Sequence, residues 1–496
     1  MTAPTDAQIY ANVSRPEYLV EWKPGVNWLP IAADDIFSVD GALEADAGQG
    51  LAFGASTASD LTIVTDDVSS ISSVTPDFVP VRVSFGYDGS AKIAGGAGII
   101  TSRARDRGSR SLTFRVEGWQ AAIKRQPVYS PLFNRRPAFT ATTALSVEDP
   151  TSGSYQAGVG NYILWTCGGR PLEQPATHSG GSFVYSCRTA LITSPWTWAA
   201  GADSWEELLR LTRSTGGQLY QAPDGVITYR TPLDFAEPVG APFTFTPDVY
   251  LNMTEDRPLN ELVRIVECSF VQRTLLPWQE VYKDDTARVI SATGATLPPI
   301  TIVPQWPLYR HGPVEVTAVD PYGGIVTPGV TVSDDKAQRI ILNITNPLTR
   351  PIVITRIRVQ GEPVAAGEEE LVEYDTGIGS LLTTKLTVES NVFIQERDHA
   401  LRLGQMIGDF YGLPRPVRVL SGCPFDPRRT LGEYVLLTDS AWGLSAAPHR
   451  ITSIRHSETG AVADYTVVDV AGLPKRSDMF ILGESYSAGD VRKLSY

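Results

Sequence analysis

The hydrophobic pattern of this chain repeats mainly every two residues, in short runs separated by turn residues. Such runs are Val79–Phe85, Ser111–Trp119, Val226–Thr231, Arg339–Thr345 and Ile352–Val359. Alternation of this period is typical of strands that bury one face. Turn pairs of the hairpin type recur between such runs: Asp88-Gly89, Asp224-Gly225 and Gly323-Gly324. The chain is therefore predicted to be mainly β.

Only two segments have the period of a helix. Trp205–Thr215 follows Ser204, with Glu207 at the spacing of a capping box, and ends at Gly216. In Val392–Tyr411 the apolar residues fall on one stripe, and Gly404 and Gly408 lie four residues apart. In a globular protein that glycine spacing favours close backbone packing over dimerisation in a membrane.

One internal match stands out. Ile100–Trp119 aligns without a gap on Ile451–Val470, and both segments begin Ile-Thr-Ser. Each copy has the pattern of strand, polar turn and strand. A duplication and a chance similarity between two alternating hairpins both explain this match. A duplication would give the chain two similar β-barrels.

The length of 496 residues predicts several domains. The predicted division is listed from the N-terminus: 1–125, a first β-barrel; 126–276, a mixed helix and hairpin domain; 277–376, an inserted β-sandwich; 377–473, the long helix and a second β-barrel; 474–496, a C-terminal arm. The predicted fold class is thus mainly β and multidomain, with a few helices.

Charge and hydropathy limit the function. The chain has 42 basic and 55 acidic side chains, a net charge of -13, which argues against a dedicated nucleic-acid binder. No apolar run is long enough to span a membrane. The residues after Met1 lack the basic and apolar regions of a signal peptide, so we expect synthesis in a cytoplasm.

Motifs for catalysis and cofactor binding are absent. The chain contains no P-loop, HExxH or GxSxG motif, and the glycines around Gly48 miss the dinucleotide-binding spacing. The histidines are scattered: His178, His311, His399, His449 and His456. A surface or interface ion pair is the favoured role for His399. We predict no catalytic, cofactor-binding or metal-binding residues, and no cofactor.

Three acidic pairs or runs are candidates for the carboxylates of a glycosidase. They are Asp284-Asp285, Asp334-Asp335 and Glu368-Glu369-Glu370. A glycosidase needs two carboxyl groups facing each other across a sugar. These runs flank predicted turns, where solvated carboxylates are usual, so a catalytic pair is disfavoured.

The cysteines and tryptophans leave two questions open. Cys167 and Cys187 could close a disulfide loop, but two free buried thiols are the favoured alternative; Cys268 and Cys423 complete the set. Trp22, Trp28, Trp119 and Trp205 occupy positions typical of a core. Trp196 and Trp198 could form an exposed platform for a sugar.

Several segments together resemble a known family. These are YLVEW from Tyr18, VPVRVSFGYDG from Val79, GIITSRARDRGSRSLTFRVEGW ending at Trp119, CGGRP at Cys167–Pro171, Asp203–Pro232 with its helix, Gly-Gly and Asp-Gly turn, Asn260–Val263, Leu431–Asp439 and His449–His456. The pattern is similar to that of tail hub proteins, also called minor tail or tail-tip proteins, of long-tailed bacteriophages. Residues 277–376 and 474–496 have no counterpart in it.

The resemblance implies a structural virion protein rather than an enzyme. It implies a homotrimeric hub in which two barrels per chain match a sixfold tail tube to threefold distal parts. The implied location is the tail tip of a virion, after synthesis in the bacterial host cytoplasm. The implied partners are the distal tail ring, tail tube and tape-measure proteins and receptor-binding or puncturing proteins. DNA would pass through the channel without specific binding, helped by acidic side chains in the lumen.

Two other functions are kept as alternatives. A carbohydrate-binding tail adhesin would use the 277–376 sandwich or the region of Trp196 and Trp198. A tail-associated cell-wall hydrolase would need an acid and a nucleophile that the sequence does not supply in a convincing pair.

Overall fold

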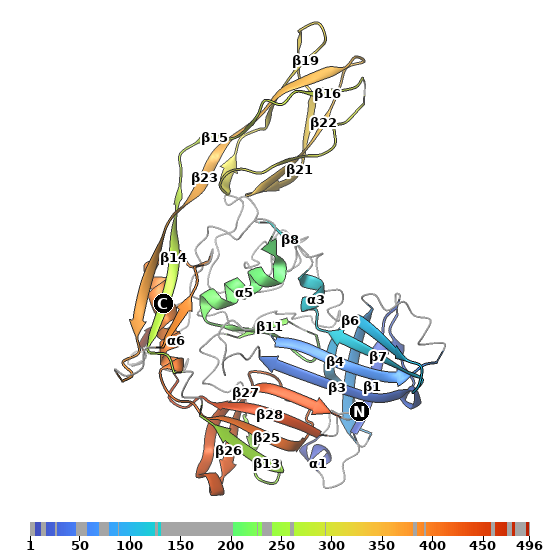
Figure 1. The fold of residues 1–496 in the computed structure, drawn as a ribbon, viewed down its shortest axis with the longest axis vertical. Coiled ribbons are helices and arrows are strands. Elements are labelled where there is room, and N and C mark those ends of the chain that lie inside the picture. The colour runs from blue at the N-terminus through green and yellow to red at the C-terminus, as the bar shows by residue number, and fades with distance from the viewer. Residues whose placement is uncertain are drawn as a thin grey trace.

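A computed structural model shows how these segments fold. It describes residues 5–10, 16–24, 27–45, 57–68, 79–87, 89–124, 127–129, 202–225, 227–230, 241–257, 262–292, 294–379, 384–390, 393–457, 462–473, 479–481 and 493–495. Figure 1 shows one long molecule with β-sheets at both ends and helices between them.

The largest sheet has 13 strands and contains residues from both ends of the chain. Its N-terminal unit consists of β1 (Pro16–Trp22), β2 (Leu29–Pro30), β3 (Ile36–Ala45), β4 (Thr57–Asp66), β5 (Pro80–Tyr87), β6 (Ile93–Asp106) and β7 (Ser111–Glu117). Its C-terminal unit consists of β12 (Phe243–Phe245), β13 (Asn252–Asp256), β25 (Val417–Pro424), β26 (Tyr434–Asp439), β27 (Leu444–Ser457) and β28 (Val462–Asp469). The two units lie side by side in Figure 1.

Alternation along the strands builds the core of this sheet. In β7, Leu112, Phe114 and Val116 are buried, and the residues between them are wholly or partly exposed. In β26 the same period buries Val435 and Leu437. These side chains belong to one continuous hydrophobic cluster that includes both units. The two units therefore share a core as well as a sheet.

Both units have the same strand order. The N-terminal unit runs β1-β5-β6-β7-β4-β3 and the C-terminal unit runs β12-β26-β27-β28-β25-β13. In each unit these strands also follow one another in the same order along the chain, with β2 as an addition to the first. The exception is orientation, because β1 is antiparallel to β5 whereas β12 is parallel to β26.

The internal match is confirmed at the level of hydrogen-bond register. The β6–β7 pairing slips between Ile100 and Ser102, and the β27–β28 pairing slips between Ile451 and Ser453. These are equivalent positions in the gapless alignment. A bulge at the same residue of both hairpins is specific, because bulges redirect a strand at one defined point.

A second group of strands lies between β13 and β25 in the sequence. It includes an eight-stranded sheet of β14 (Ile265–Leu275), β15 (Gln279–Asp284), β16 (Arg288–Ile290), β18 (Leu308–His311), β19 (Glu315–Val319), β20 (Ile325–Val326), β23 (Ile352–Asp375) and β24 (Lys385–Val388). A three-stranded sheet of β17 (Ile300–Ile302), β21 (Gly329–Lys336) and β22 (Arg339–Thr345) accompanies it. The 24-residue β23 extends through most of this arm in Figure 1.

Isoleucines dominate the core at the far end of this arm. Ile340, Leu342 and Ile344 of β22 and Ile352 and Ile354 of β23 are fully buried in one cluster. Two facing sheets with alternating buried residues are the pattern of a sandwich. The division of the chain into five predicted domains stays a prediction.

Three helices lie in the middle of the molecule in Figure 1: α3 (Gln120–Ile123), α5 (Ser204–Thr215) and α6 (Arg397–Tyr411). Helix α1 (Asp6–Ile9) lies at its lower end beside β13, and the 3-10 turns are η1 (Ala33–Asp35) and η6 (Ser440–Trp442). Short pairs complete the described strands: β8 (Pro127–Val128) with β9 (Ala202–Asp203), β10 (Gln218–Gln221) with β11 (Ile227–Arg230), and β29 (Met479–Ile481) with β30 (Lys493–Ser495).

Two details of the helix prediction were wrong. Asp203, not Ser204, is the N-cap of α5, because its carboxylate accepts hydrogen bonds from the N–H groups of Trp205 and Glu206. The helix α6 begins at Arg397, five residues after the predicted start at Val392. The close packing predicted at Gly408 is confirmed, since a Cβ there would lie 2.5 Å from the ring of Tyr374.

The predicted mainly β fold with a few helices is confirmed. Within the described ranges, the strand pairing closes neither unit into a barrel, and each unit is an open stretch of the shared sheet. The reason lies at β3: its outer edge pairs with β27 of the other unit instead of closing onto β1.

Candidate assembly interface

The two units meet edge to edge at β3 and β27. Residues Gly41–Glu44 pair antiparallel with Ser453–His456. The start of β27 pairs with β26 along the same edge, and β28 occupies its other edge. The joint is therefore made from main-chain hydrogen bonds between segments from opposite ends of the chain.

A buried histidine lies across this joint. His456 is 4% exposed, and a Cβ on Gly41 would lie 2.2 Å from its Nε2 atom. Its ring lies 5.4 Å from that of Phe85 and 4.5 Å from that of Phe425, measured between centroids. Only glycine fits at residue 41 without moving the imidazole.

Burial determines the protonation of this histidine. Loss of hydration lowers the pKa of His456 to about 4, although the charge of Asp40 acts in the opposite direction. The imidazole is therefore neutral at pH 7. The centre of the joint therefore carries no charge on this side chain.

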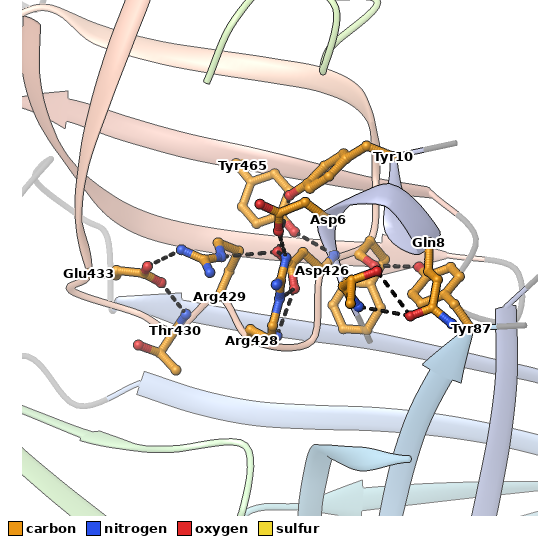
Figure 2. Close-up of polar contacts among 12 residues, drawn as sticks. Asp6, Gln8, Tyr10, Tyr87, Asp426, Arg428, Arg429, Thr430, Glu433 and Tyr465 are labelled. Atoms are coloured by element: carbon orange, nitrogen blue, oxygen red, sulfur yellow. Dashed lines mark hydrogen bonds and ion pairs between the residues drawn. The ribbon is translucent and has the colours of Figure 1, made fainter. Parts of the chain in front are cut away.

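A polar cluster ties the N-terminal helix to the C-terminal unit (Figure 2). Asp426 is fully buried and accepts two hydrogen bonds from the guanidinium of Arg428, at 2.8 and 2.7 Å. It also accepts one from Arg429 at 3.2 Å. Arg428 reaches Asp6 of α1 at 2.5 Å, and Arg429 bonds Glu433. The loop between β25 and β26 thus carries a network of alternating charges.

Three tyrosines complete this cluster. The hydroxyl of Tyr10 donates to Asp426 at 3.1 Å, and the N–H of Asp426 donates to the hydroxyl of Tyr465 at 3.0 Å. The hydroxyl of Tyr87, on β5 of the N-terminal unit, donates to the carbonyl of Phe425. Burial raises the pKa of all three phenols, and the charge of Asp426 adds to that effect.

The cluster keeps its central carboxylate ionised. Burial alone would raise the pKa of Asp426, but hydrogen bonds from Arg428 and the charges of Arg429 and Arg428 outweigh it and lower that pKa. The same hydrogen bonds raise the pKa of Arg428. A buried ion pair is costly to break from one side, because removal of one partner leaves the other charge buried and unpaired.

The strand β10 makes hydrogen bonds to both units. The amide of Gln221 donates to the carbonyl of Ala97 at 2.7 Å and accepts from the N–H of Trp119 at 2.7 Å. Three residues earlier, Gln218 accepts a hydrogen bond from the buried Arg450 at 2.8 Å. Ala97 belongs to β6 and Arg450 to the equivalent β27, so one short strand holds both copies of the repeat.

A further charged group supports β13. Arg418 of β25 contacts Glu255 at 2.6 Å and also bonds Nε2 of His449. Burial, followed by the charge of Arg418, lowers the pKa of His449, against the effects of the Ala447 carbonyl and nearby acids. This histidine is a structural hydrogen-bond partner within the sheet.

The described histidines lie at separate places in the structure. His311 bonds Asp335 at 2.7 Å in the arm, far along the chain from His449 and His456. The expected surface or interface ion pair of His399 is wrong: this residue is 7% exposed, and its Nε2 atom lies 2.6 Å from the carbonyl oxygen of Ser214 on α5. His178 lies outside the described residues.

All residues of the acidic runs except Asp285 lie in strands rather than in the loops predicted for them. Asp284 ends β15 and bonds Arg288 at 2.6 Å. Asp334 of β21 bonds Arg339, and Glu368–Glu370 belong to β23. The pairing of β23 with β14 lies beyond Ile352–Val359, the run whose alternation predicted this strand.

Cysteines and tryptophans give a mixed outcome. Cys268 and Cys423 are free and buried. Trp22, Trp119 and Trp205 are core residues as predicted, whereas Trp28 is half-buried, with the guanidinium of Arg82 4.4 Å from its ring centroid. The candidates Cys167, Cys187, Trp196 and Trp198, and the glycines around Gly48, lie outside the described residues.

No group of three or more potential metal ligands occurs among the described residues. None of the helices in these ranges is long and apolar enough to cross a membrane.

The sequence patterns did not predict the polar cluster or the Gln221 contacts. Asp426-Pro427-Arg428-Arg429 was a local signal, because one acidic residue beside two arginines predicts an internal ion pair. The hydrogen bonds from Tyr10 and Tyr87 had no such signal, since these residues lie hundreds of positions away from Asp426.

No protein-family model matches the chain, and a search of curated proteins finds no match. Several solved structures are similar to it. A tail protein from Neisseria meningitidis is 9% identical, with a TM-score of 0.45, over 92% of this chain and 97% of that one. A 43 kDa tail protein of a Shewanella oneidensis prophage is 12% identical, with a TM-score of 0.41, over 92% and 99%. A prophage tail protein from Listeria monocytogenes is 8% identical, with a TM-score of 0.40, over 91% and 94%.

Proposed function

We propose that this chain is a structural protein of a long-tailed phage virion and forms the homotrimeric central hub of the tail tip. The observation that carries the proposal is the internal repeat. One chain supplies two units of the same strand order, joined edge to edge through β3 and β27.

Two similar units in each chain would allow a trimer to match neighbours of different symmetry. Three chains with two similar units each present six similar positions to one neighbour and three whole chains to another. A tail tube with sixfold symmetry and distal parts with threefold symmetry need such an adaptor between them. The shared core and the hydrogen bond from Tyr87 to the carbonyl of Phe425 hold the two units in one fixed orientation, as an adaptor requires.

The proposed partners follow from this position. The hub contacts the tail tube and distal tail ring on one side and receptor-binding or puncturing proteins on the other, and it holds the end of the tape-measure protein. DNA leaves through its centre without specific binding. The net charge of -13 supports this passage, because acidic side chains repel the phosphate backbone.

The proposed role needs no catalysis. Among the described acidic runs, hydrogen bonds from Thr286 and Arg288 lower the pKa of Asp284, which makes it unsuited to act as a general acid, and Asp334 is bonded to Arg339. A cell-wall hydrolase would release soluble muropeptides from host envelopes. We expect the purified full-length chain to release none.

Two measurements test the proposal. Native mass spectrometry of the full-length chain should show three copies, and negative-stain images should show a ring. Gold-labelled antibody to the chain should mark the distal end of the tail on intact virions. Label along the tube or on the capsid would overturn the tail-tip assignment, and a stable dimer would overturn the symmetry argument.

One feature favours a second function, that of a carbohydrate-binding adhesin. Tyr322, in the turn between β19 and β20, and Ile325, the first residue of β20, are 85% and 84% exposed. Aromatic faces stack on sugar rings. Glycan-array binding by the full-length chain that Tyr322→Ala abolishes and Trp442→Ala leaves intact would support this function. Absence of binding to host cell-wall polysaccharide would contradict it.

A further inference from the structure

Strand β3 joins the two units, whereas its equivalent in the C-terminal unit, β13, makes no such joint in the described part of the chain. In the repeat, β13 of the C-terminal unit corresponds to β3 of the N-terminal unit. Met253 matches Val39, because each is paired through one intermediate strand to an aromatic residue, Tyr465 or Phe114, at equivalent positions of β28 and β7. By the same route Glu255 matches Gly41.

The edges of these two strands differ. β3 pairs with β4 on one side and with β27 on the other. In the described part of the chain, β13 pairs with β25 alone. The outer edge of β13 therefore offers the hydrogen-bonding groups that β3 uses in the joint.

The partner edge is present on the other unit. In β27, Ser453–His456 form the joint with β3. The equivalent residues of β6 are Ser102–Arg105, which pair with β7, whereas the recorded pairs between β5 and β6 run only from Ile93 to Ile99. At Ala104 and Arg105 no strand of the described ranges covers the edge away from β7. Both residues are exposed.

The open edges of β6 and β13 do not pair with each other within the described part of the chain. The internal joint is made by the other strand of each unit, β3 and β27. A second copy can supply the missing strand to each edge. The resulting contact is heterologous: the β6 edge of one copy meets the β13 edge of the next. Unpaired edges of this kind are otherwise sites of uncontrolled pairing.

We propose that the Ala104–Arg105 edge of β6 pairs antiparallel with the Glu255–Asp256 end of β13 in a second copy of this chain. Transfer of the internal register places Arg105 opposite Glu255 and Ala104 opposite Asp256. The internal joint has the pairs His456 with Gly41 and Arg455 with Ala42 at these positions. The inference rests on the proposed function only in treating the assembly as a closed trimer.

Charge supports this register at Arg105 and Glu255, whereas the next position places Arg103 opposite Arg257, beyond the end of β13. β6 presents Arg105, which is 60% exposed at its side chain and bonded to Asp67. β13 presents Glu255, bonded to Arg418 and Arg257, beside the exposed Asp256. Opposite charges on facing strand residues favour one register over its neighbours. The internal joint has the close contact between His456 and Gly41 at this position instead, so the two kinds of joint differ in their side chains.

Disulfide trapping tests the register in the full-length chain. The double variant Ala104→Cys/Asp256→Cys places two thiols at directly opposed positions, and Ala104→Cys/Thr254→Cys places the second thiol two residues away on the same face. After mild oxidation the first variant should give covalent dimers and trimers on non-reducing gels. The second variant and either single Ala104→Cys or Asp256→Cys should give at least tenfold less of these species.

Each result decides a different point. Covalent trimers with no larger species support both the edge pairing and the closed ring. A ladder that continues past three chains supports the edge pairing and contradicts the trimer of the proposed function. Native trimers that form no cross-link in the matched variant overturn this inference and leave the proposed function standing. A chain that stays monomeric at 100 µM without a cross-link overturns it as well, while virion labelling still decides the tail-tip role.

A charge reversal gives an independent readout. Arg105→Glu should weaken assembly at least tenfold, measured as the concentration at which half the chains are assembled. Arg107→Glu makes the same change of charge two residues along, in the turn after β6, and should change that concentration less than threefold. Equal effects of the two variants would indicate general repulsion and overturn the pairing.

Discussion

His456 lies directly against Gly41, so closely that a methyl group at residue 41 would come within 2.2 Å of its Nε2 atom. These residues come from opposite ends of the chain and face each other across the only joint between β3 and β27 in the described sheet. The contact makes the orientation of the two units sensitive to a single atom.

Gly41→Ala should lower the stability of this sheet by about 1–3 kcal/mol, because the imidazole must move in a packed site. Chemical unfolding followed by tryptophan fluorescence would measure the change. Gly379→Ala is the matched control, since a Cβ there meets nothing within 4 Å. If both variants unfold like the parent, the joint is looser than its geometry indicates.

Acid should destabilise the joint through His456. The folded pKa of about 4 lies below the ordinary value of 6.5, so between these values the unfolded chain binds a proton that the folded chain does not. The contribution is complete above about pH 6.5 and is lost as the pH falls toward 4, by about 3 kcal/mol in all. The lowered pKa values of His399 and His449 act in the same direction.

The test is the slope of stability against pH. His456→Gln cannot take up this proton, so its unfolding free energy should fall less steeply than that of the parent between pH 6.5 and 4. Parallel slopes for parent and variant would show that His456 takes up its proton over the same pH range in the folded and the unfolded chain, which contradicts the burial argument.

Asp426→Asn should be the most damaging single polar substitution in the described sheet. It removes the charge that compensates Arg428 and Arg429 while the carboxyl site stays buried. Loss of one partner from a buried ion pair costs about 3–5 kcal/mol. Asp60→Asn, which breaks a half-exposed pair with Arg115, should lower the unfolding free energy by much less. Similar losses in the two variants would contradict the special role of the buried cluster.

Gln221→Leu should loosen the attachment of β10 to the N-terminal unit. The substitution leaves the N–H of Trp119 and the carbonyl of Ala97 without their buried partner, at a cost of about 1–3 kcal/mol. Hydrogen exchange at the Trp119 amide should become faster in this variant and stay unchanged in the exposed-site control Gln405→Leu. Unchanged exchange at Trp119 in both variants would mean that this contact does not protect the amide.

Local features were predictable where neighbours along the chain determine them. The hairpins of β6–β7 and β27–β28 were predicted with the correct strands, because a period of two places alternate side chains in a core whatever lies opposite. The end of α6 was predicted correctly, whereas its start was not, because the apolar pattern extends N-terminal of Arg397, where the helix begins. The N-cap of α5 was misplaced by one residue because Asp203 and Ser204 can both cap, and only the backbone geometry chooses between them.

The sequence by itself determined the mainly β class, the two helices and the match between Ile100–Trp119 and Ile451–Val470, all of which depend on side-chain periodicity within one segment. Only the tertiary structure decided that β3 pairs with β27, that His399 is buried against Ser214, and that Asp426 collects arginines and tyrosines from three elements. Strand edges are chemically alike in every sequence, because main-chain N–H and C=O groups carry no residue identity. The choice of partner therefore comes from packing of the whole chain, down to a glycine that leaves room for one imidazole.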